Sequence, residues 1–262
     1  MKDRRNIFRS LWPPAVVLIA VVVAMQVAAR ILDEPFLLPT PGAVLRVMMQ
    51  RRTDLLASLL TTAEAALIGF FASAIIGILI AMILSASPLA RRAIYPYTVF
   101  FQTVPIVAIA PLLVIWCGPG IWAVALSAFI VSVFPVIANT MNGLMSTDPA
   151  LEDLFRLYGA KSRSRMWKLK LPSALPNIFT GLRVAAGLAV IGTVVGEFLV
   201  GLFGPGEGLG VRIVSAKKTG HTDLMFAAVL IASLLGLAMF AAINLAARLM
   251  LRHWHASEQD RT

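Results

Sequence analysis

Long apolar segments recur along this chain, and they constrain its fold more than any other feature. A helix needs about 20 apolar residues to cross the hydrocarbon core of a bilayer. Six segments approach or exceed that length: residues 13–29, 59–84, 93–117, 121–139, 177–201 and 224–249. Hydrophobic residues make up 59% of the 262 positions and charged residues only 14%, which excludes an ordinary water-soluble globular protein. The sequence therefore predicts an all-α membrane protein with six spanning helices.

Polar groups inside two of these segments are candidates for a solute pathway. Pro105 interrupts the third segment, and we expect the helix to bend there. Gln102 and Thr103 lie just before that bend, where side chains of neighbouring helices could surround them. Glu197 lies deep in the fifth segment, where a carboxylate is costly. It either lines the pathway or latches a gate, or else it makes a structural hydrogen bond to a neighbouring helix or lies at the outer interface, where water reaches it.

Basic residues orient the predicted spans. If both termini are cytoplasmic, the inside segments hold about twice as many Lys and Arg residues as the outside segments, as the positive-inside rule requires. The net charge of +10 then reflects topology and not a nucleic-acid partner. Residues 46–52 are an exception, because three arginines fall there on the outer side, in a predicted amphipathic helix whose role is open. The basic N-terminus leads into residues 13–29 without a convincing cleavage pattern, so we predict an uncleaved first span.

Three regions follow from this topology. Residues 1–58 hold the first span and its periplasmic connection, residues 59–249 the five-span core, and residues 250–262 a cytoplasmic tail. The core includes a long cytoplasmic loop, residues 140–176.

No residue pattern indicates catalysis. Residues 204–210 are rich in glycine but follow a membrane span, whereas a phosphate-binding loop follows a β-strand. We predict a mobile external loop there. The single cysteine, Cys117, excludes a cysteine-based zinc site, and no cluster of metal ligands is visible. The sequence predicts neither an enzyme, nor a metal site, nor a cofactor.

The loop between the fourth and fifth segments contains a well-punctuated helix. Asp148 suits the N-cap, Pro149 the first helical position and Gly159 the end of the helix. Four apolar residues share one face at helical spacing: Leu151, Leu154, Phe155 and Tyr158. This stripe could pack on its own bundle or in the lipid interface, or it could enter a groove on a soluble partner.

The residues after this helix resemble a known motif. Nine residues separate Gly159 from Leu169, which begins the run Leu-Lys-Leu-Pro ending at Pro172. This resembles the cytoplasmic motif of ABC importer permeases, which reads EAA, three residues, G, nine residues, I-x-L-P. Asp153 stands at the position of the motif's Glu, and Leu154 and Phe155 at its two Ala positions. Residues 102–113, and residues 195–198 with 208–210, are similar to segments of permeases for sulfonates, taurine, nitrate and related solutes.

The resemblance implies a type I importer permease in the bacterial inner membrane. Its coupling helix would dock on ATP-binding cassette ATPase subunits, which bind the ATP, so this chain itself would need no cofactor. Residues implied in that coupling are Leu151, Asp153, Leu154, Phe155, Tyr158, Gly159, Ala160, Leu171 and Pro172. Pathway candidates are Gln102, Thr103, Pro105 and Glu197.

The same resemblance implies several partners and a range of solutes. A second permease copy or a homologous permease, a periplasmic solute-binding protein and membrane lipid would complete the system. The solute would be a small organic molecule, such as a sulfonate, a nitrate-like anion or a pyrimidine or flavin vitamin precursor. A self-contained secondary transporter or channel is the alternative, and it would predict inverted repeats or several ionisable residues within the spans.

Overall fold

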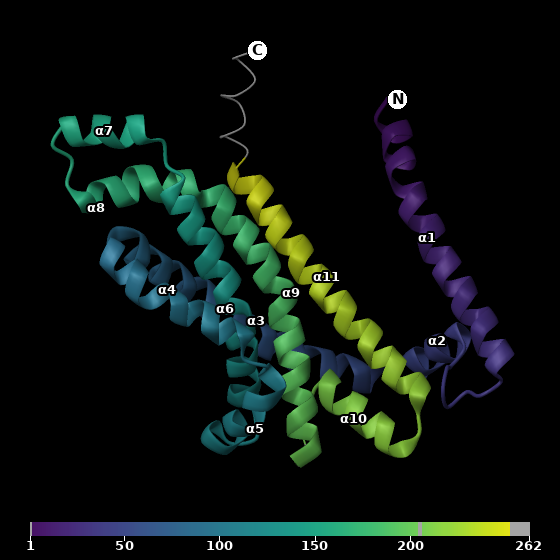
Figure 1. Ribbon diagram of the computed structural model, residues 1–262. Helices are drawn as coiled ribbons and strands as arrows, with labels where there is room; N and C mark the ends of the chain where they lie inside the picture. Colours follow the sequence, from purple (N-terminus) through teal and green to yellow (C-terminus); the bar gives the residue numbers. More distant parts are fainter. Residues whose placement is uncertain (1, 204–205, 252–262) are drawn as a thin grey trace.

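The computed structural model describes residues 2–203 and 206–251, and every regular element in this part of the chain is helical (Figure 1). Five helices are long and apolar enough to cross a membrane. They are α1 (Lys2–Leu32), α3 (Arg52–Ala86), α6 (Ile121–Met145), α9 (Leu171–Phe203) and α11 (Thr222–Leu251). Each contains one of the six predicted segments. Most of the predicted tail, from residue 252 on, and positions 204–205 of the glycine-rich run lie outside the described residues.

The third predicted segment is two helices and not one. Helix α4 (Pro88–Thr103) ends before Val104, and α5 (Ile106–Cys117) begins after Pro105. Val104 is extended, with φ −72° and ψ 122°, as expected for a residue that precedes a proline. Because Pro105 also lacks the N–H that would continue the helix, the expected bend is a complete break. At 1.5 Å per residue, α5 alone covers roughly 18 Å and cannot cross a bilayer.

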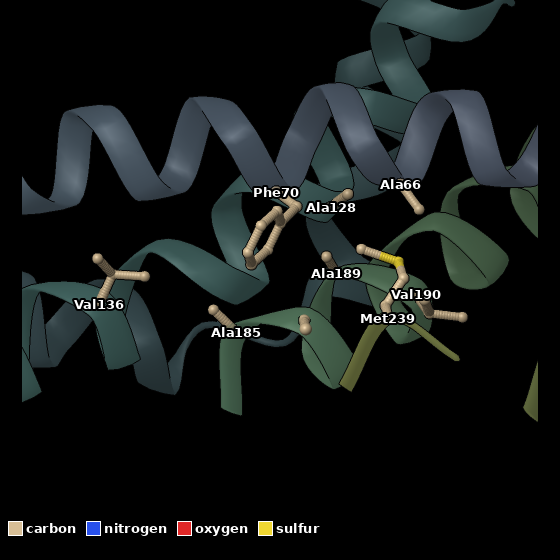
Figure 2. Packing of buried hydrophobic residues seen from close by; sticks show 9 residues of the cluster. Ala66, Phe70, Ala128, Val136, Ala185, Ala189, Val190 and Met239 are labelled. Carbon is tan, nitrogen blue, oxygen red and sulfur yellow. The ribbon is translucent and has the colours of Figure 1, made fainter. Parts of the chain in front are cut away.

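Small residues bring the central helices α3, α6 and α9 into close contact. Ala128 of α6 lies between Gly69 of α3 and Gly192 of α9. A Cβ added at Gly69 would lie 2.5 Å from Ala128 Cβ, and one added at Gly192 would lie 2.8 Å from Ala128 Cα. Figure 2 shows Phe70 and the neighbouring alanines in this contact region. Backbones can approach so closely only where side chains are absent or short, which is how membrane helices gain packing energy without a hydrophobic drive.

Several helices lie at the edge of this bundle. Helix α1 stands apart and contacts chiefly α2 (Pro41–Gln50), so only 6% of its apolar window is buried (Figure 1). Helix α2 is amphipathic, as predicted, and the Thr40 hydroxyl caps it by accepting a hydrogen bond from the Ala43 N–H at 3.2 Å. Helix α10 (Leu209–Thr219) packs against α9 and α11.

The cytoplasmic loop predicted from residue 140 to residue 176 is largely helical. It holds α7 (Pro149–Leu157), α8 (Ser162–Arg165) and a π-helical turn from Met166 to Lys170 that runs directly into α9. Pro172 and Pro176 therefore lie within a continuous helical segment that begins before them. The π turn widens the helix just where a regular α-helix would press the ring of Pro172 against the carbonyl four residues earlier.

Candidate functional site

Helix α7 has the start and the end that its sequence predicts. Asp148 is the N-cap, and its Oδ1 accepts a hydrogen bond from the Ala150 N–H at 2.8 Å. Gly159 follows the last turn with φ +70°, a conformation that favours glycine. The Gly159 N–H donates to the Arg156 carbonyl and the Ala160 N–H to the Phe155 carbonyl, each at 2.9 Å. This pair of bonds satisfies carbonyls that would otherwise be orphaned and turns the chain sharply away from the helix.

Most of the apolar stripe of α7 is exposed. Tyr158 is 83% exposed, while Leu151 and Leu154 are 44% and 45% exposed. Phe155 is half-buried, and no residue of α7 is buried. In Figure 1, α7 stands clear of the ends of the membrane helices. The stripe therefore does not pack on its own bundle, which leaves the lipid interface or a partner protein to cover it.

One ion pair links α7 to the π turn, and two more lie within α7. Glu152 accepts from Lys170 Nζ at 3.2 Å and from Arg156 at 3.3 Å, and Asp153 lies 3.6 Å from Arg156. Partial burial by itself would raise the pKa of Glu152. The hydrogen bond from Lys170 and the charges of Lys170, Arg156 and Arg165 outweigh it and hold that pKa below its usual value. The Glu152–Lys170 pair thus sets the position of α7 over the π turn.

Acid should release this attachment. Because the pKa of Glu152 is lowered on folding, the pair stabilises the loop above the ordinary carboxyl pKa of 4.5, and this stabilisation disappears as the pH falls through the lowered value. Both groups are partly exposed, so we expect at most about 1 kcal/mol. A spin label at Leu157→Cys, in a Cys117→Ser background, should become more mobile below that pH. Lys170→Met should make the label mobile at neutral pH as well, whereas Lys168→Gln should not.

Leu171 and Pro172 lie away from the stripe. Both are half-buried at the start of α9, and Leu171 packs on a core cluster that includes Leu84, Leu144 and Ile178. They hold the base of the loop against the bundle. The structure thus separates the predicted coupling residues into an exposed set on α7 and an anchoring pair on α9.

The two groups of predicted pathway residues also lie apart. Gln102 is exposed and lines an apolar cavity of about 620 Å³ between α4, α5 and α6, together with Tyr97 and Trp116. The Thr103 hydroxyl donates to the Phe100 carbonyl at 2.8 Å, and Pro105 is exposed at the helix break. Glu197 does not border this cavity.

Glu197 instead joins three helices at the end of the bundle opposite α7. It is 1% exposed, and its Oε2 accepts from the Thr62 hydroxyl of α3 at 3.0 Å and from the Gly210 N–H of α10 at 2.8 Å. The Thr62 oxygen in turn accepts from the Leu209 N–H at 2.8 Å. The Thr62 hydrogen is also within reach of the Ser58 carbonyl, at 2.9 Å, so it donates to one of these two acceptors at a time. Sequence reasoning identified Glu197 but missed Thr62.

Gly208 brings the chain close to this carboxyl group. Its φ of +113° is rare for other residues, and a Cβ there would collide with the Glu197 carboxyl atoms. One turn farther along α10, Arg212 Nε donates to Ser58 Oγ at 3.0 Å. The prediction of a mobile loop is therefore wrong for residues 208–210, which are packed and hydrogen-bonded. The sequence Gly-Leu-Gly at residues 208–210 could have indicated this close packing, because each glycine lets the backbone approach Glu197.

Gly208→Ala should be markedly destabilising. The new methyl group must displace the Glu197 carboxyl group and also sits on an unfavourable φ, so we expect a loss of about 2–4 kcal/mol in the free energy of unfolding. Gly187→Ala is the matched control, because a Cβ there meets nothing within 4 Å and the residue is helical. That change should be neutral or slightly stabilising. Unfolding in mixed detergent micelles would measure both variants, and equal stabilities would contradict the packing at Gly208.

The second oxygen of Glu197 has no hydrogen-bond partner among the described residues. A buried acceptor left unpaired costs about 1–3 kcal/mol, so such atoms call for an explanation. Glu197 borders a cavity of about 350 Å³ that Glu64 and Glu207 also line. Within residues 2–203 and 206–251, however, no three His, Cys, Asp or Glu side chains converge closely enough to hold a metal ion.

Apolar helices long enough to span a membrane, with a capped amphipathic helix outside them, are the features of an integral membrane protein. Residues 73–253 match the family described as binding-protein-dependent transport system inner membrane component, and this chain belongs to that family. It is therefore a permease of the ABC importer class.

Named relatives agree with this assignment. The formylaminopyrimidine transport permease protein ThiX of Halalkalibacterium halodurans is 38% identical over 88% of this chain and 91% of its own length. The riboflavin transport system permease protein RibX of Chloroflexus aurantiacus is 31% identical over 97% of this chain and 95% of its own. A putative aliphatic sulfonates transport permease protein of Bacillus subtilis is 30% identical over 94% and 89%.

The fold also matches a solved transporter. A chain of the MetNI methionine ABC transporter, in inward-facing conformations, superimposes with a TM-score of 0.64 at 18% identity. The match covers 76% of this chain and 97% of that chain. The likeness establishes the fold of the core.

Proposed function

We propose that this chain forms the solute pathway of an ABC importer and receives its energy through α7. The exposed apolar stripe of α7 carries this proposal. A short, doubly capped helix whose apolar face is left uncovered, while its other face is tied down by Glu152–Lys170, is suited to fill a groove on a partner. We assign that groove to an ATP-binding cassette ATPase subunit, which would bind the ATP.

The proposed topology has six crossings with both termini in the cytoplasm. Helices α4 and α5 would together make one broken crossing, with the Val104–Pro105 break shielded inside the assembly. The start of α1 and the end of α11 lie at the same end of the bundle as α7, which supports a common cytoplasmic side (Figure 1). The clustered bases from Lys161 to Lys170 at this end favour the same side and could contact anionic lipid headgroups.

A single copy would not enclose a pathway. The faces of α1 and the cavity beside Gln102 are apolar and uncovered, which supports pairing with a second copy or a homologous permease within lipid. A periplasmic binding protein would deliver a small organic solute, as the names of the relatives suggest for a pyrimidine, a flavin or a sulfonate. A self-contained transporter is less well supported, because ion coupling calls for several ionisable groups within the spans, and Glu197 alone is buried among the described acidic residues.

Reconstitution tests this proposal directly. The chain would be expressed with candidate ATPase and binding-protein partners, purified in mild detergent and placed in liposomes. We expect the ATPase to co-purify and uptake to require ATP and the binding protein. Uptake by this chain alone, without ATP, would overturn the proposal in favour of a self-contained transporter.

A further inference from the structure

A carboxylate-lined cavity at the end of the bundle opposite α7 is not explained by the packing of the fold. It lies between the start of α3, the turn into α6 and the residues that follow α9. Its described lining includes Thr61, Glu64, Gly120, Glu197 and Glu207, and no Lys or Arg is among them. Its volume of about 350 Å³ is at the lower end of the range for small-molecule pockets.

Glu197 provides a second and independent indication of a ligand. The side chain is 1% exposed, and its Oε2 lies within hydrogen-bond distance of the Thr62 hydroxyl and the Gly210 N–H. Glu197 is one of the residues that line this cavity, and its Oε1 has no hydrogen-bond donor among the described residues. A buried acceptor beside a cavity is satisfied when a ligand or an ordered water supplies the missing hydrogen. One oxygen of a side chain that lines the cavity, Glu197 Oε1, thus has no hydrogen-bond donor from the part of the chain that the structure describes.

We propose that this cavity receives a planar, positively charged N–H donor group, such as an amidinium or a protonated aminopyrimidine, carried by the transported solute. This inference rests on the proposed import function and names the class of solute. One N–H would bond Glu197 Oε1, while Glu64 and Glu207 at the rim would attract the positive charge. A sulfonate or nitrate would meet only acceptors and negative charge here.

The spacing of the carboxylates favours an organic group over a metal ion. Among the described residues, Glu64, Glu197 and Glu207 border one cavity but do not converge as metal ligands do. A group several atoms wide can reach carboxylates that a single ion cannot. Glu64 and Glu207 are exposed, so solvent weakens their attraction for a positive charge. Glu197 is buried, so its interaction with a nearby group is screened less.

Three probes with the same ring and different charge would test this inference. Benzamidine is a cation with N–H donors, benzamide is neutral, and benzenesulfonate is an anion. Each would be titrated against the purified full-length permease in nanodiscs, with binding followed by saturation-transfer NMR. We expect saturable binding of benzamidine, weaker binding of benzamide and none of benzenesulfonate. A titration that follows a single saturable isotherm would indicate one class of site.

Charge-neutral variants locate the site. Glu64→Gln combined with Glu207→Gln should weaken benzamidine binding about tenfold, because two attractive charges are removed while Glu197 and its contacts stay in place. Glu34→Gln is the matched control, since it removes an exposed carboxylate that does not line this cavity, and it should leave the affinity unchanged. Unchanged affinity in the double variant, or benzenesulfonate binding as tight as that of benzamidine, would overturn the inference.

Co-purification with the ATPase separates this inference from the proposed function. The double variant should still recover the ATPase, because Glu64 and Glu207 lie at the end opposite α7. If wild-type chain recovers the ATPase but shows no benzamidine binding, the solute class is wrong and the import function stands. If the ATPase is not recovered with wild-type chain, the import function itself fails.

Discussion

Gly159→Pro should abolish ATP-driven uptake while leaving the protein inserted in the membrane. The φ of Gly159 is +70°, whereas proline fixes φ near −65°. Proline also removes the N–H that bonds the Arg156 carbonyl at 2.9 Å. The exit from α7 must therefore rearrange, at a cost of about 3 kcal/mol or more, and the stripe ending at Tyr158 would no longer be presented in one direction. We expect recovery of the ATPase subunit in a mild-detergent pull-down to fall at least tenfold.

Gly118→Pro is the matched control for this change. Gly118 has φ +77°, follows α5 at the opposite end of the bundle and, like Gly159, has nothing within 4 Å of an added Cβ. The conflict with proline's φ is the same, although Gly159→Pro also removes a hydrogen bond, and no contact with the ATPase is expected at Gly118. ATPase recovery should stay normal in Gly118→Pro. Gly159→Ala should give an intermediate loss of ATPase recovery, because alanine keeps the N–H and is unfavourable only for its left-handed φ. Equal ATPase losses in both proline variants would mean that α7 is not the docking element.

The sequence predicted α7 more accurately than the third membrane segment. In α7 the determinants are local: an N-cap at Asp148, a stop at Gly159 and four apolar residues at helical spacing. In the third segment, Pro105 signalled a disturbance. Whether the helix bends or breaks depends on which neighbours supply donors and acceptors to the freed backbone groups, and those neighbours come from elsewhere in the chain. The same limit explains why α10 was missed, since its helix begins at a buried contact with Glu197.

The polar cluster at Glu197 could be anticipated only in part. Charge deep in an apolar segment predicts a partner, because an unpaired carboxylate there is too costly. The partner itself was not predictable, since Thr62 is 135 residues away and occurs in an apolar helix like many other threonines. Local periodicity carries no information about which helix faces which. Only the packing of α3 and of α9 against α6, which small residues such as Gly69 and Gly192 allow, brings the two side chains together.

Removing the Glu197 side chain should be among the most damaging single changes to this protein. Glu197→Ala leaves the Gly210 N–H without its acceptor and opens a void where α3, α9 and α10 meet, so we expect a loss of about 3–5 kcal/mol in the free energy of unfolding. Glu197→Gln keeps an oxygen for the Gly210 N–H and nearly the same volume, so its loss should be about 1 kcal/mol. Unfolding in mixed micelles would measure both, and similar losses would show that the hydrogen bonds of the carboxyl group, and not packing volume, dominate here.

Thr62→Val then tests whether the three helices are joined through these hydrogen bonds. It removes the donor to Glu197 and also the acceptor of the Leu209 N–H, so we expect a loss of about 2 kcal/mol. Thr193→Val is the matched control, because Thr193 is equally buried but bonds only the Ala189 carbonyl of its own helix. Its loss should be below about 0.5 kcal/mol. Combining Thr62→Val with Glu197→Ala should give less than the sum of the two losses, by about 1 kcal/mol, since each change removes the hydrogen bond between the two side chains. Simple additivity would mean that α10 is held by packing alone, and that Glu197 could move without releasing it.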